Sequence, residues 1–168
     1  MSNTNQEIVV AGGCFWGVEE LIRKVPGITD TEVGYTGGHF KNPTYNEVKT
    51  GTTGHAEAVK IAFDPKIISS QKVLQLFFQL HDPTTLNRQG NDVGTQYRSA
   101  IFYKNEEERN LAEAVIRAED QSGRWARPVA TTLEPLTEFY SAESFHQDYL
   151  QKNPGGYNCH YWRGTDPL

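Results

Sequence analysis

The stretch IVVAGGCFWG, residues 8–17, decides how the chain begins to fold. Its apolar first half indicates a short buried strand, and two glycines separate that strand from Cys14. Beyond Cys14, apolar residues recur at the spacing of one helix face as far as Val25. We therefore predict a strand over residues 7–12 and a helix over residues 14–24, with Cys14 in the first turn of the helix.

The position of Cys14 predicts a reactive sulfur. Unpaired backbone N–H groups at a helix start, together with the helix dipole, favour the thiolate and lower the pKa of a cysteine. A buried core cysteine is the alternative, since Cys14 lies four residues before Val18 on the same helix face. The flanking glycines favour the reactive cysteine, because they allow a close backbone approach that core packing does not need. Phe15 and Trp16 cannot both join the apolar face, so one or both are expected to line a small apolar pocket.

The rest of the chain alternates between strand and helix patterns. Strands are predicted over 28–35, 55–64, 97–103 and 130–133, and helices over 70–81, from Asn105 onward and over 144–151. Loops are expected over 37–54 and 82–95. The order strand-helix-strand-strand-helix-strand predicts an α+β fold with a ferredoxin-like split βαβ sheet, covered by helices on one face.

The composition limits the class of protein. With 16 basic and 21 acidic side chains in 168 residues, the chain has no basic patch for nucleic acid or for an anionic membrane. No apolar run approaches the ~20 residues that cross a bilayer, and the polar leader, residues 1–6, has no signal-peptide pattern. We expect a monomeric cytoplasmic protein that binds neither nucleic acid nor a membrane. In a reducing compartment, two cysteines favour catalytic or redox chemistry over a structural disulfide.

A single domain over residues 1–168 is expected, because the chain shows no repeat, low-complexity tract or linker. Its last part, residues 153–168, is predicted to be a long irregular tail that contains glycine. The tail carries the second cysteine, Cys159, shortly after Gly155 and Gly156.

Four further residues are candidates for a functional site, namely Tyr45, Glu57, Asp92 and Tyr97. Small apolar neighbours are expected to desolvate the Glu57 carboxylate and raise its pKa, which suits a general acid, whereas a surface glutamate is the alternative. For Tyr45 and Tyr97 the alternative is a half-buried aromatic ring with a solvated hydroxyl. For Asp92 the alternative is a turn residue.

Metal and nucleotide sites are not expected. The five histidines show no zinc spacing, and Cys159-His160 is an isolated pair. No Gly-rich phosphate-binding motif follows a predicted strand. We therefore expect no cofactor.

Several motifs occur in order along the chain: GCFWG (13–17), GYTGG (34–38), NPTY (42–45), GHAE (54–57), DVGTQYRS (92–99) and GGYNC (155–159). Together they resemble the peptide methionine sulfoxide reductase A family, over roughly residues 7–160. The resemblance implies one catalytic domain that reduces the S epimer of methionine sulfoxide, free or in oxidised proteins. It also implies thioredoxin as the electron donor.

The same resemblance implies roles for the matching residues. Cys14 would be the nucleophile, Glu57 the acid, Tyr45 and Tyr97 partners of the sulfoxide oxygen, Phe15 and Trp16 the methyl pocket, Asp92 a support of the site, and Cys159 the resolving cysteine. Some members of the family carry two tail cysteines, whereas this chain has only Cys159. A cycle of two cysteines is therefore implied.

The chemistry of a sulfoxide agrees with this assignment. Its reduction needs a hydrogen-bond donor for the oxygen, an apolar slot for the methyl group and a thiolate for the sulfur. A thiol peroxidase is one alternative, but it has no use for the apolar slot that Phe15 and Trp16 suggest. A non-enzymatic binding domain, with Cys14 and Cys159 in a structural disulfide, is the other.

Overall fold

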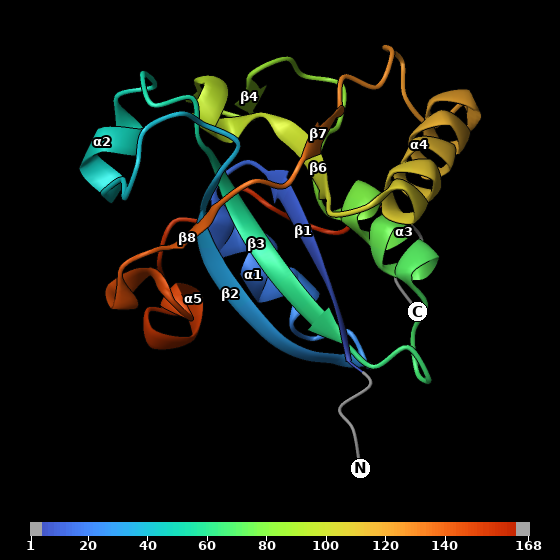
Figure 1. Ribbon diagram of the computed structural model, residues 1–168, viewed down its shortest axis with the longest axis horizontal. Helices are drawn as coiled ribbons and strands as arrows, with labels where there is room; N and C mark the ends of the chain where they lie inside the picture. The colour runs from blue at the N-terminus through green and yellow to red at the C-terminus, as the bar shows by residue number, and fades with distance from the viewer. Residues whose placement is uncertain (1–4, 164–168) are drawn as a thin grey trace.

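The computed structural model describes residues 5–163 and shows a mixed α+β fold (Figure 1). The strands are β1 (Gln6–Gly12), β2 (Ile28–Thr36), β3 (Ala56–Phe63), β4 (Arg88–Gln89), β5 (Asp92–Val93), β6 (Ser99–Tyr103), β7 (Thr132–Pro135) and β8 (Phe139–Ser141). The helices are α1 (Phe15–Ile22), α2 (Tyr45–Lys49), α3 (Ser70–Leu80), α4 (Glu106–Gln121) and α5 (Tyr149–Lys152), with short 3₁₀ helices η1 (Thr95–Tyr97) and η2 (Ser144–His146).

Six of these strands form one sheet in the order β7-β6-β1-β3-β2-β8. Strands β1 and β2 flank β3, which runs antiparallel to both, so β1 and β2 are parallel to each other. Val10 near the end of β1 pairs with Val59 of β3. The C-terminal end of β1 therefore lies beside the N-terminal end of β3. This brings Cys14 and Glu57 together at the same end of the two central strands.

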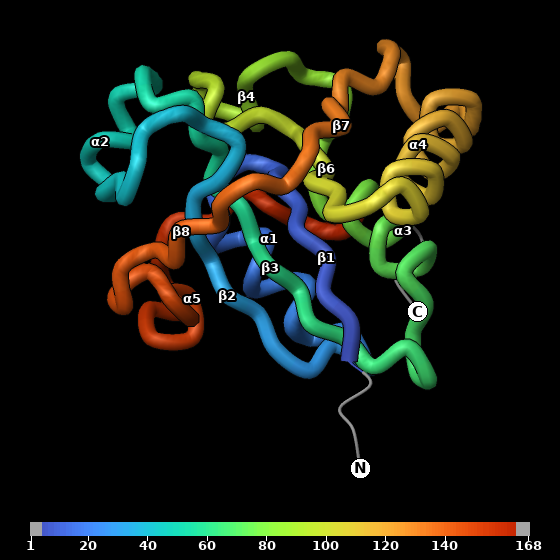
Figure 2. Tube along the Cα trace, in the orientation of Figure 1, coloured from blue at the N-terminus to red at the C-terminus, as the bar shows by residue number. Residues whose placement is uncertain are grey.

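The main hydrophobic core lies between the sheet and the helices α1, α3 and α4. Figures 1 and 2 show α1 behind the sheet and the segment between β7 and β8 crossing in front of it. A smaller cluster on that second face includes Val9, Ala58 and Phe102, with Leu136 and Phe139 of the crossing segment packed against it. Each fully buried Val, Leu, Ile or Phe stabilises the fold by about 1.5–3 kcal/mol. Both faces of the central strands are therefore buried.

Polar residues define where several helices begin. The Ser69 hydroxyl accepts a hydrogen bond from the Lys72 N–H at the start of α3, and Asn105 Oδ1 accepts one from the Glu108 N–H at the start of α4. Thr44 forms a capping box with Glu47 at the start of α2. These bonds satisfy backbone N–H groups that have no partner inside the helix.

The predicted elements that carry the core are confirmed, with small shifts at their ends. The strand expected over 97–103 begins at Ser99, because residues 95–97 form η1 instead. The loop expected over 37–54 contains α2, and the one expected over 82–95 contains the β4-β5 hairpin. The prediction of loops there was wrong, because a two-residue strand and a one-turn helix are too short to show periodicity.

The single helix predicted over 144–151 was also wrong. The structure has η2, a break, and then α5, because Asp148 adopts a left-handed backbone with φ of 56°. Buried Glu19 of α1 accepts a hydrogen bond from the Asp148 N–H at 3.0 Å, and Arg23 pairs with the Asp148 carboxylate. A contact with a distant helix therefore overrides the local helical pattern.

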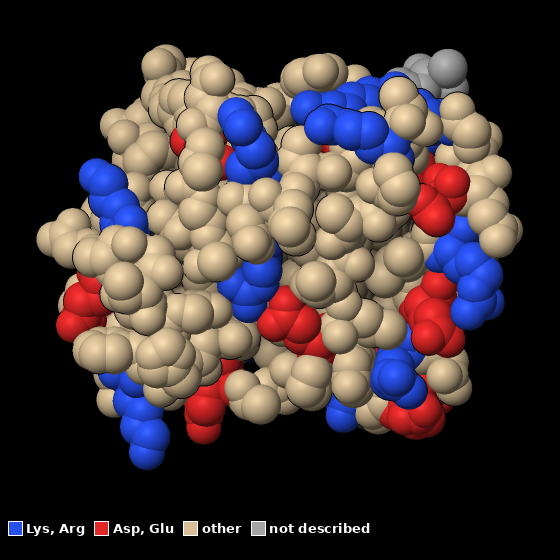
Figure 3. All heavy atoms as spheres, turned by 90° about the horizontal axis from the view of Figure 1, so that it is seen from above, with Lys and Arg blue, Asp and Glu red and all other residues tan. Residues whose placement is uncertain are grey.

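No helix among residues 5–163 is long and apolar enough to cross a membrane. Acidic and basic side chains are interspersed on the face shown in Figure 3, and uncharged residues form most of that face. The first four residues of the predicted leader, and residues 164–168 of the predicted tail, lie outside the described residues. Residues 153–163 contain no helix or strand.

Candidate active site

Cys14 caps the N-terminus of α1, directly after β1, and is only 8% exposed. Its sulfur makes no capping hydrogen bond, but the nearby Trp16 backbone N–H favours the thiolate, as expected at a helix start. Burial nevertheless raises the pKa of the Cys14 thiol well above its usual value, and the nearby Glu57 raises it further. The prediction of a lowered pKa was therefore wrong, since desolvation outweighs the helix start. In the absence of substrate, Cys14 is a buried thiol.

Glu57 is the second residue of β3 and is 2% exposed. Its Oε1 accepts a hydrogen bond from the Phe15 N–H at 3.2 Å, which joins the carboxyl group to the residue after Cys14. Burial raises the pKa of Glu57 to about 8. The predicted rise is confirmed, and at neutral pH the side chain carries a transferable proton. A surface position for Glu57 is excluded.

Tyr45 and Tyr97 are half-buried on two separate segments, at the start of α2 and the end of η1. Burial, followed by the charge of Glu57, raises the pKa of Tyr45 to about 12 and raises that of Tyr97 above its usual value. The Cys14 thiol contributes to both shifts. The structure therefore brings both phenols near Cys14 and Glu57, and both hydroxyls keep their protons.

Phe15 and Trp16 lie in different surroundings. Phe15 is fully buried in the same core as Val18, with its ring centroid 5.7 Å from that of Tyr35. Trp16 is half-buried, and its ring stacks on Tyr149 at a centroid distance of 3.8 Å. The Trp16 indole is therefore a rigid apolar surface beside Cys14.

Asp92 and Cys159 lie together at the tail. The Asp92 Oδ2 accepts a hydrogen bond from the Tyr157 hydroxyl at 3.1 Å and lies 3.9 Å from Cys159 Sγ. Both cysteines are free thiols, and Cys159 is half-buried. Cys159 and Asp92 are among the groups that raise the pKa of Cys14. The tail, 145 positions later in the chain, thus returns to the first cysteine.

The tail is held against the start of α1. His160 Nε2 lies 2.7 Å from the Gly12 carbonyl oxygen, and the Asn158 side chain accepts a hydrogen bond from the His160 N–H at 2.9 Å. A Cβ added at Gly17 would clash with His160 Nδ1 and Asn158 Oδ1. Gly17 is therefore needed in α1 because the tail passes directly over it.

Three residues of the site were not predicted from the sequence. Glu143 accepts hydrogen bonds from the Tyr35 hydroxyl at 2.8 Å and from the Tyr45 N–H at 2.9 Å, so it positions the start of α2. His146 Nδ1 accepts a hydrogen bond from the Trp16 indole N–H at 3.0 Å, which fixes the orientation of the indole ring. Neither belongs to a motif, and the helical pattern predicted over 144–151 gave no sign that His146 contacts Trp16. His160 did have a signal, since it directly follows Cys159.

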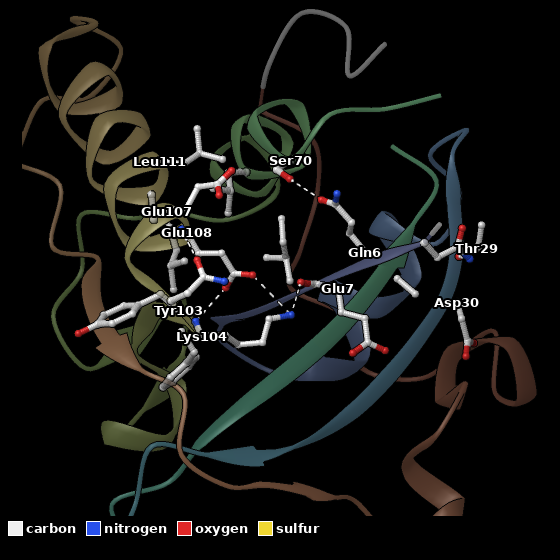
Figure 4. A pocket seen from close by; sticks show the side chains of 18 residues that line it. Gln6, Glu7, Thr29, Asp30, Ser70, Tyr103, Lys104, Glu107, Glu108 and Leu111 are labelled. Carbon is white, nitrogen blue, oxygen red and sulfur yellow. Dashed lines mark hydrogen bonds and ion pairs between the residues drawn. The ribbon is translucent and has the colours of Figure 1, made fainter. Parts of the chain in front are cut away.

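No group of three or more His, Cys, Asp or Glu side chains in residues 5–163 has the arrangement of a metal site. A cavity of about 760 Å³ opens between β1, β6, α3 and α4, where Glu7, Ser70, Lys104 and Glu108 line it (Figure 4). None of the predicted site residues lines this cavity. The cluster around Cys14 is therefore distinct from it.

Comparisons with known proteins identify relatives over nearly the whole chain. The model of the peptide methionine sulfoxide reductase family matches residues 6–166. The peptide methionine sulfoxide reductase MsrA of Streptomyces coelicolor is 52% identical over 163 residues, which cover 97% of this chain and 92% of that protein. That of Methanothermobacter thermautotrophicus is 52% identical over 149 residues, covering 89% of this chain and 88% of that protein.

Solved structures show the same relationship. The reduced form of Mxr1 from Saccharomyces cerevisiae superposes with a TM-score of 0.90 at 39% identity, covering 96% of this chain and 93% of that chain. Mxr1 in complex with Trx2 superposes with a TM-score of 0.64 at 27% identity, covering 96% and 91%. The family model spans nearly the whole chain, and relatives share about half of its residues. This chain therefore belongs to the peptide methionine sulfoxide reductase family.

Proposed function

We propose that this protein reduces the S epimer of methionine sulfoxide to methionine, in the free amino acid and in oxidised proteins, and that thioredoxin returns it to the reduced state. The observation that carries the proposal is a cluster of a buried thiol, Cys14, a buried protonated carboxyl, Glu57, and two half-buried phenols, Tyr45 and Tyr97. Mxr1, a structural relative, has been crystallised with Trx2, which supports the choice of thioredoxin.

The reduction step uses the proton of Glu57. As the sulfoxide oxygen accepts that proton, its sulfur becomes more electrophilic, and Cys14 Sγ attacks it. The sulfoxide sulfur gains two electrons and leaves as methionine, while Cys14 loses two electrons and keeps the oxygen as a sulfenic acid. Because burial raises the pKa of Cys14, its sulfur keeps its proton until substrate binds. This keeps the free enzyme unreactive. As the sulfur attacks, that proton passes to the Glu57 carboxylate, so the sulfenic acid keeps one hydrogen and Glu57 ends protonated again.

Hydrogen bonds and apolar contacts select the substrate. The hydroxyls of Tyr45 and Tyr97 keep their protons and donate them toward the sulfoxide oxygen, with Asp92 as a nearby support. Phe15 and the fixed indole of Trp16 hold the methyl group. Methionine itself lacks the oxygen and leaves these donors unpaired, so product binds more weakly than substrate.

Cys159 completes the cycle. Its thiol attacks the Cys14 sulfenic acid and gives a disulfide and water, and thioredoxin reopens the disulfide by exchange. We propose that residues 1–168 act as a single catalytic domain with a short polar leader and a tail that carries this cysteine. Its central strands follow a ferredoxin-like split βαβ arrangement, supported by the position of β3 between β1 and β2. A reducing compartment such as the cytoplasm suits two free thiols.

The two epimers of methionine sulfoxide test the function directly. With a dithiol as reductant, the enzyme is expected to convert the S epimer to methionine and to leave the R epimer unchanged, because the donors for the oxygen and the slot for the methyl group fix one chirality at sulfur. Chiral chromatography of both substrates measures this. Consumption of hydrogen peroxide without reduction of either epimer would instead favour a thiol peroxidase.

The variant Cys159→Ser tests the second half of the cycle. In a single turnover without reductant it is expected to release one methionine per enzyme and to retain Cys14 as a sulfenic acid, because no second thiol can condense with it. Dimedone labelling and mass spectrometry detect that state. With thioredoxin the variant is expected to stall, whereas steady-state turnover at the wild-type rate would show that thioredoxin reduces Cys14 directly.

A further inference from the structure

His160 is a buried side chain in contact with both the tail and the start of α1. It is 5% exposed, and its two ring nitrogens face different groups. Nε2 lies 2.7 Å from the Gly12 carbonyl oxygen, and Nδ1 lies 3.7 Å from Cys159 Sγ. The reduction of the sulfoxide by Cys14 and Glu57 does not use this imidazole.

The Gly12 carbonyl decides which nitrogen of His160 carries the hydrogen. A carbonyl oxygen only accepts hydrogen bonds, so Nε2 must be the N–H donor. In the neutral ring, Nδ1 is then unprotonated and can only accept. The group that faces Nδ1 is the Cys159 thiol, which has one hydrogen to donate.

The surroundings keep both groups uncharged at rest. Burial lowers the pKa of His160 to about 4, so the imidazole is neutral near pH 7 and its Nδ1 is available. Burial raises the pKa of Cys159, so the sulfur keeps its proton. The pair therefore rests as thiol and imidazole, and it exchanges a proton only when the sulfur begins to form a bond.

We propose that His160 accepts the thiol proton of Cys159 as the sulfur of Cys159 attacks the sulfenic acid of Cys14. This inference rests on the function proposed above. The S–H bond of Cys159 and the S–O bond of Cys14 break, and the S–S bond forms. In formal terms the Cys159 sulfur loses one electron and the Cys14 sulfur gains one, so both reach the oxidation level of a disulfide. Hydroxide leaves Cys14, takes the proton back from His160 and departs as water, so the imidazole ends neutral.

The backbone places this base close to where the hydroxide leaves. Gly12 is two residues before Cys14, so its bond to Nε2 ties the imidazole to the loop that carries the sulfenic acid. Gly17 has no side chain and leaves room for Nδ1 at the start of α1. The imidazole is therefore held by the loop that carries one sulfur while its Nδ1 faces the other.

Asp92 is the rival acceptor. Its Oδ2 is 3.9 Å from Cys159 Sγ, slightly farther than His160 Nδ1, and it already accepts the Tyr157 hydroxyl at 3.1 Å. If His160 is the acceptor, substituting His160 slows disulfide formation; if Asp92 is the acceptor, substituting Asp92 slows it instead.

The test follows disulfide formation in the reduced enzyme after one equivalent of methionine S-sulfoxide, by rapid acid quench and titration of free thiols. Released methionine is measured in the same samples. The variant His160→Gln keeps an N–H that can reach the Gly12 carbonyl but has no basic nitrogen. We expect it to form the disulfide about 10²-fold more slowly, within the usual effect of a general base. Tyr161→Phe, a change at an exposed neighbour, is the matched control and is expected to keep the wild-type rate.

Added imidazole distinguishes a role of His160 as a base from a role in holding the tail in place. In His160→Ala, added imidazole is expected to restore part of the rate of disulfide formation. A rate in His160→Gln within about threefold of wild type, where losing a general base should cost far more, would overturn the proposal. The proposal would also be overturned if Asp92→Asn greatly slowed disulfide formation while His160→Gln did not. If the wild-type enzyme releases no methionine, the proposed function is wrong. If the wild-type enzyme releases methionine and His160→Gln forms the disulfide at the normal rate, only the role of His160 is wrong.

One measurement needs no variant. In wild-type enzyme with ¹⁵N-labelled histidine, nuclear magnetic resonance is expected to show His160 with hydrogen on Nε2 and none on Nδ1. The opposite tautomer would overturn the proposal, because an Nδ1 that already carries hydrogen cannot accept another. This measurement can overturn the proposal even if the substitutions at His160 destabilise the fold.

Discussion

The variant Cys14→Ser is expected to release no methionine from methionine sulfoxide above the background without enzyme. Serine preserves the shape of the side chain, but a hydroxyl is a far weaker nucleophile than a thiol and has no base beside it to take its proton. Because Cys14 is buried, the smaller oxygen fits the same space. The expected result is complete loss of activity in a folded protein.

Amino-acid analysis after incubation with the S epimer and dithiothreitol measures this loss, and thermal melting followed by circular dichroism checks the fold. Cys159→Ser is the matched control, since it makes the same change at the other cysteine and is expected to keep the first turnover. Repeated turnover by Cys14→Ser would assign the nucleophile to another residue.

The variant Glu57→Gln is expected to slow the reduction step by about 10² to 10⁴-fold, the usual contribution of a general acid. The amide keeps an oxygen that can accept the Phe15 N–H but has no transferable proton. Single-turnover release of methionine measures the step. Glu106→Gln, at a largely exposed glutamate of α4, is the control and is expected to behave as wild type. If Glu57→Gln retains a third of the wild-type rate or more, another group donates the proton.

The pKa of Glu57 also sets two pH dependences. Because it is raised to about 8, the wild-type rate is expected to fall as the pH rises through that value, and the rate of the Gln variant is expected to show no such fall.

The stability of the fold is also expected to depend on Glu57. Between the ordinary pKa of glutamate and about 8, the folded protein keeps a proton that the unfolded chain has released. The free energy of unfolding therefore falls with rising pH in this window. Glu57→Gln should melt no lower than wild type above pH 8.

The sequence was sufficient to predict the residues that local pattern and motif define. The strand before Cys14, the helix after it and the strand that carries Glu57 all show regular spacing of apolar residues. Antiparallel pairing of β1 with β3 then brings the two residues together. Small apolar neighbours of Glu57 were enough to predict a raised pKa, because desolvation acts in one direction on a carboxyl group.

What could not be predicted depends on contacts between distant segments. The pKa of Cys14 rises because the whole site buries it, whereas its place at the helix start alone indicated a fall. Glu143 reaches Tyr45 across 98 positions, and His146 reaches Trp16 across 130. Both come from the segment after β8, where contacts with distant elements override the local helical pattern. Local sequence carries no signal for partners of this kind.

The two halves of the site differ in how firmly the fold holds them. Cys14 and Glu57 extend from paired strands at the centre of the six-stranded sheet, and opening core strands of this kind generally costs close to the global free energy of unfolding. Cys159 belongs to residues 153–163, which lack a ladder of backbone bonds and are held by side chains such as His160. Segments of this second kind open locally at a small fraction of the global free energy. The reducing half of the enzyme is thus part of its most cooperative unit, while the recycling half can open to meet a partner without disturbing the sheet.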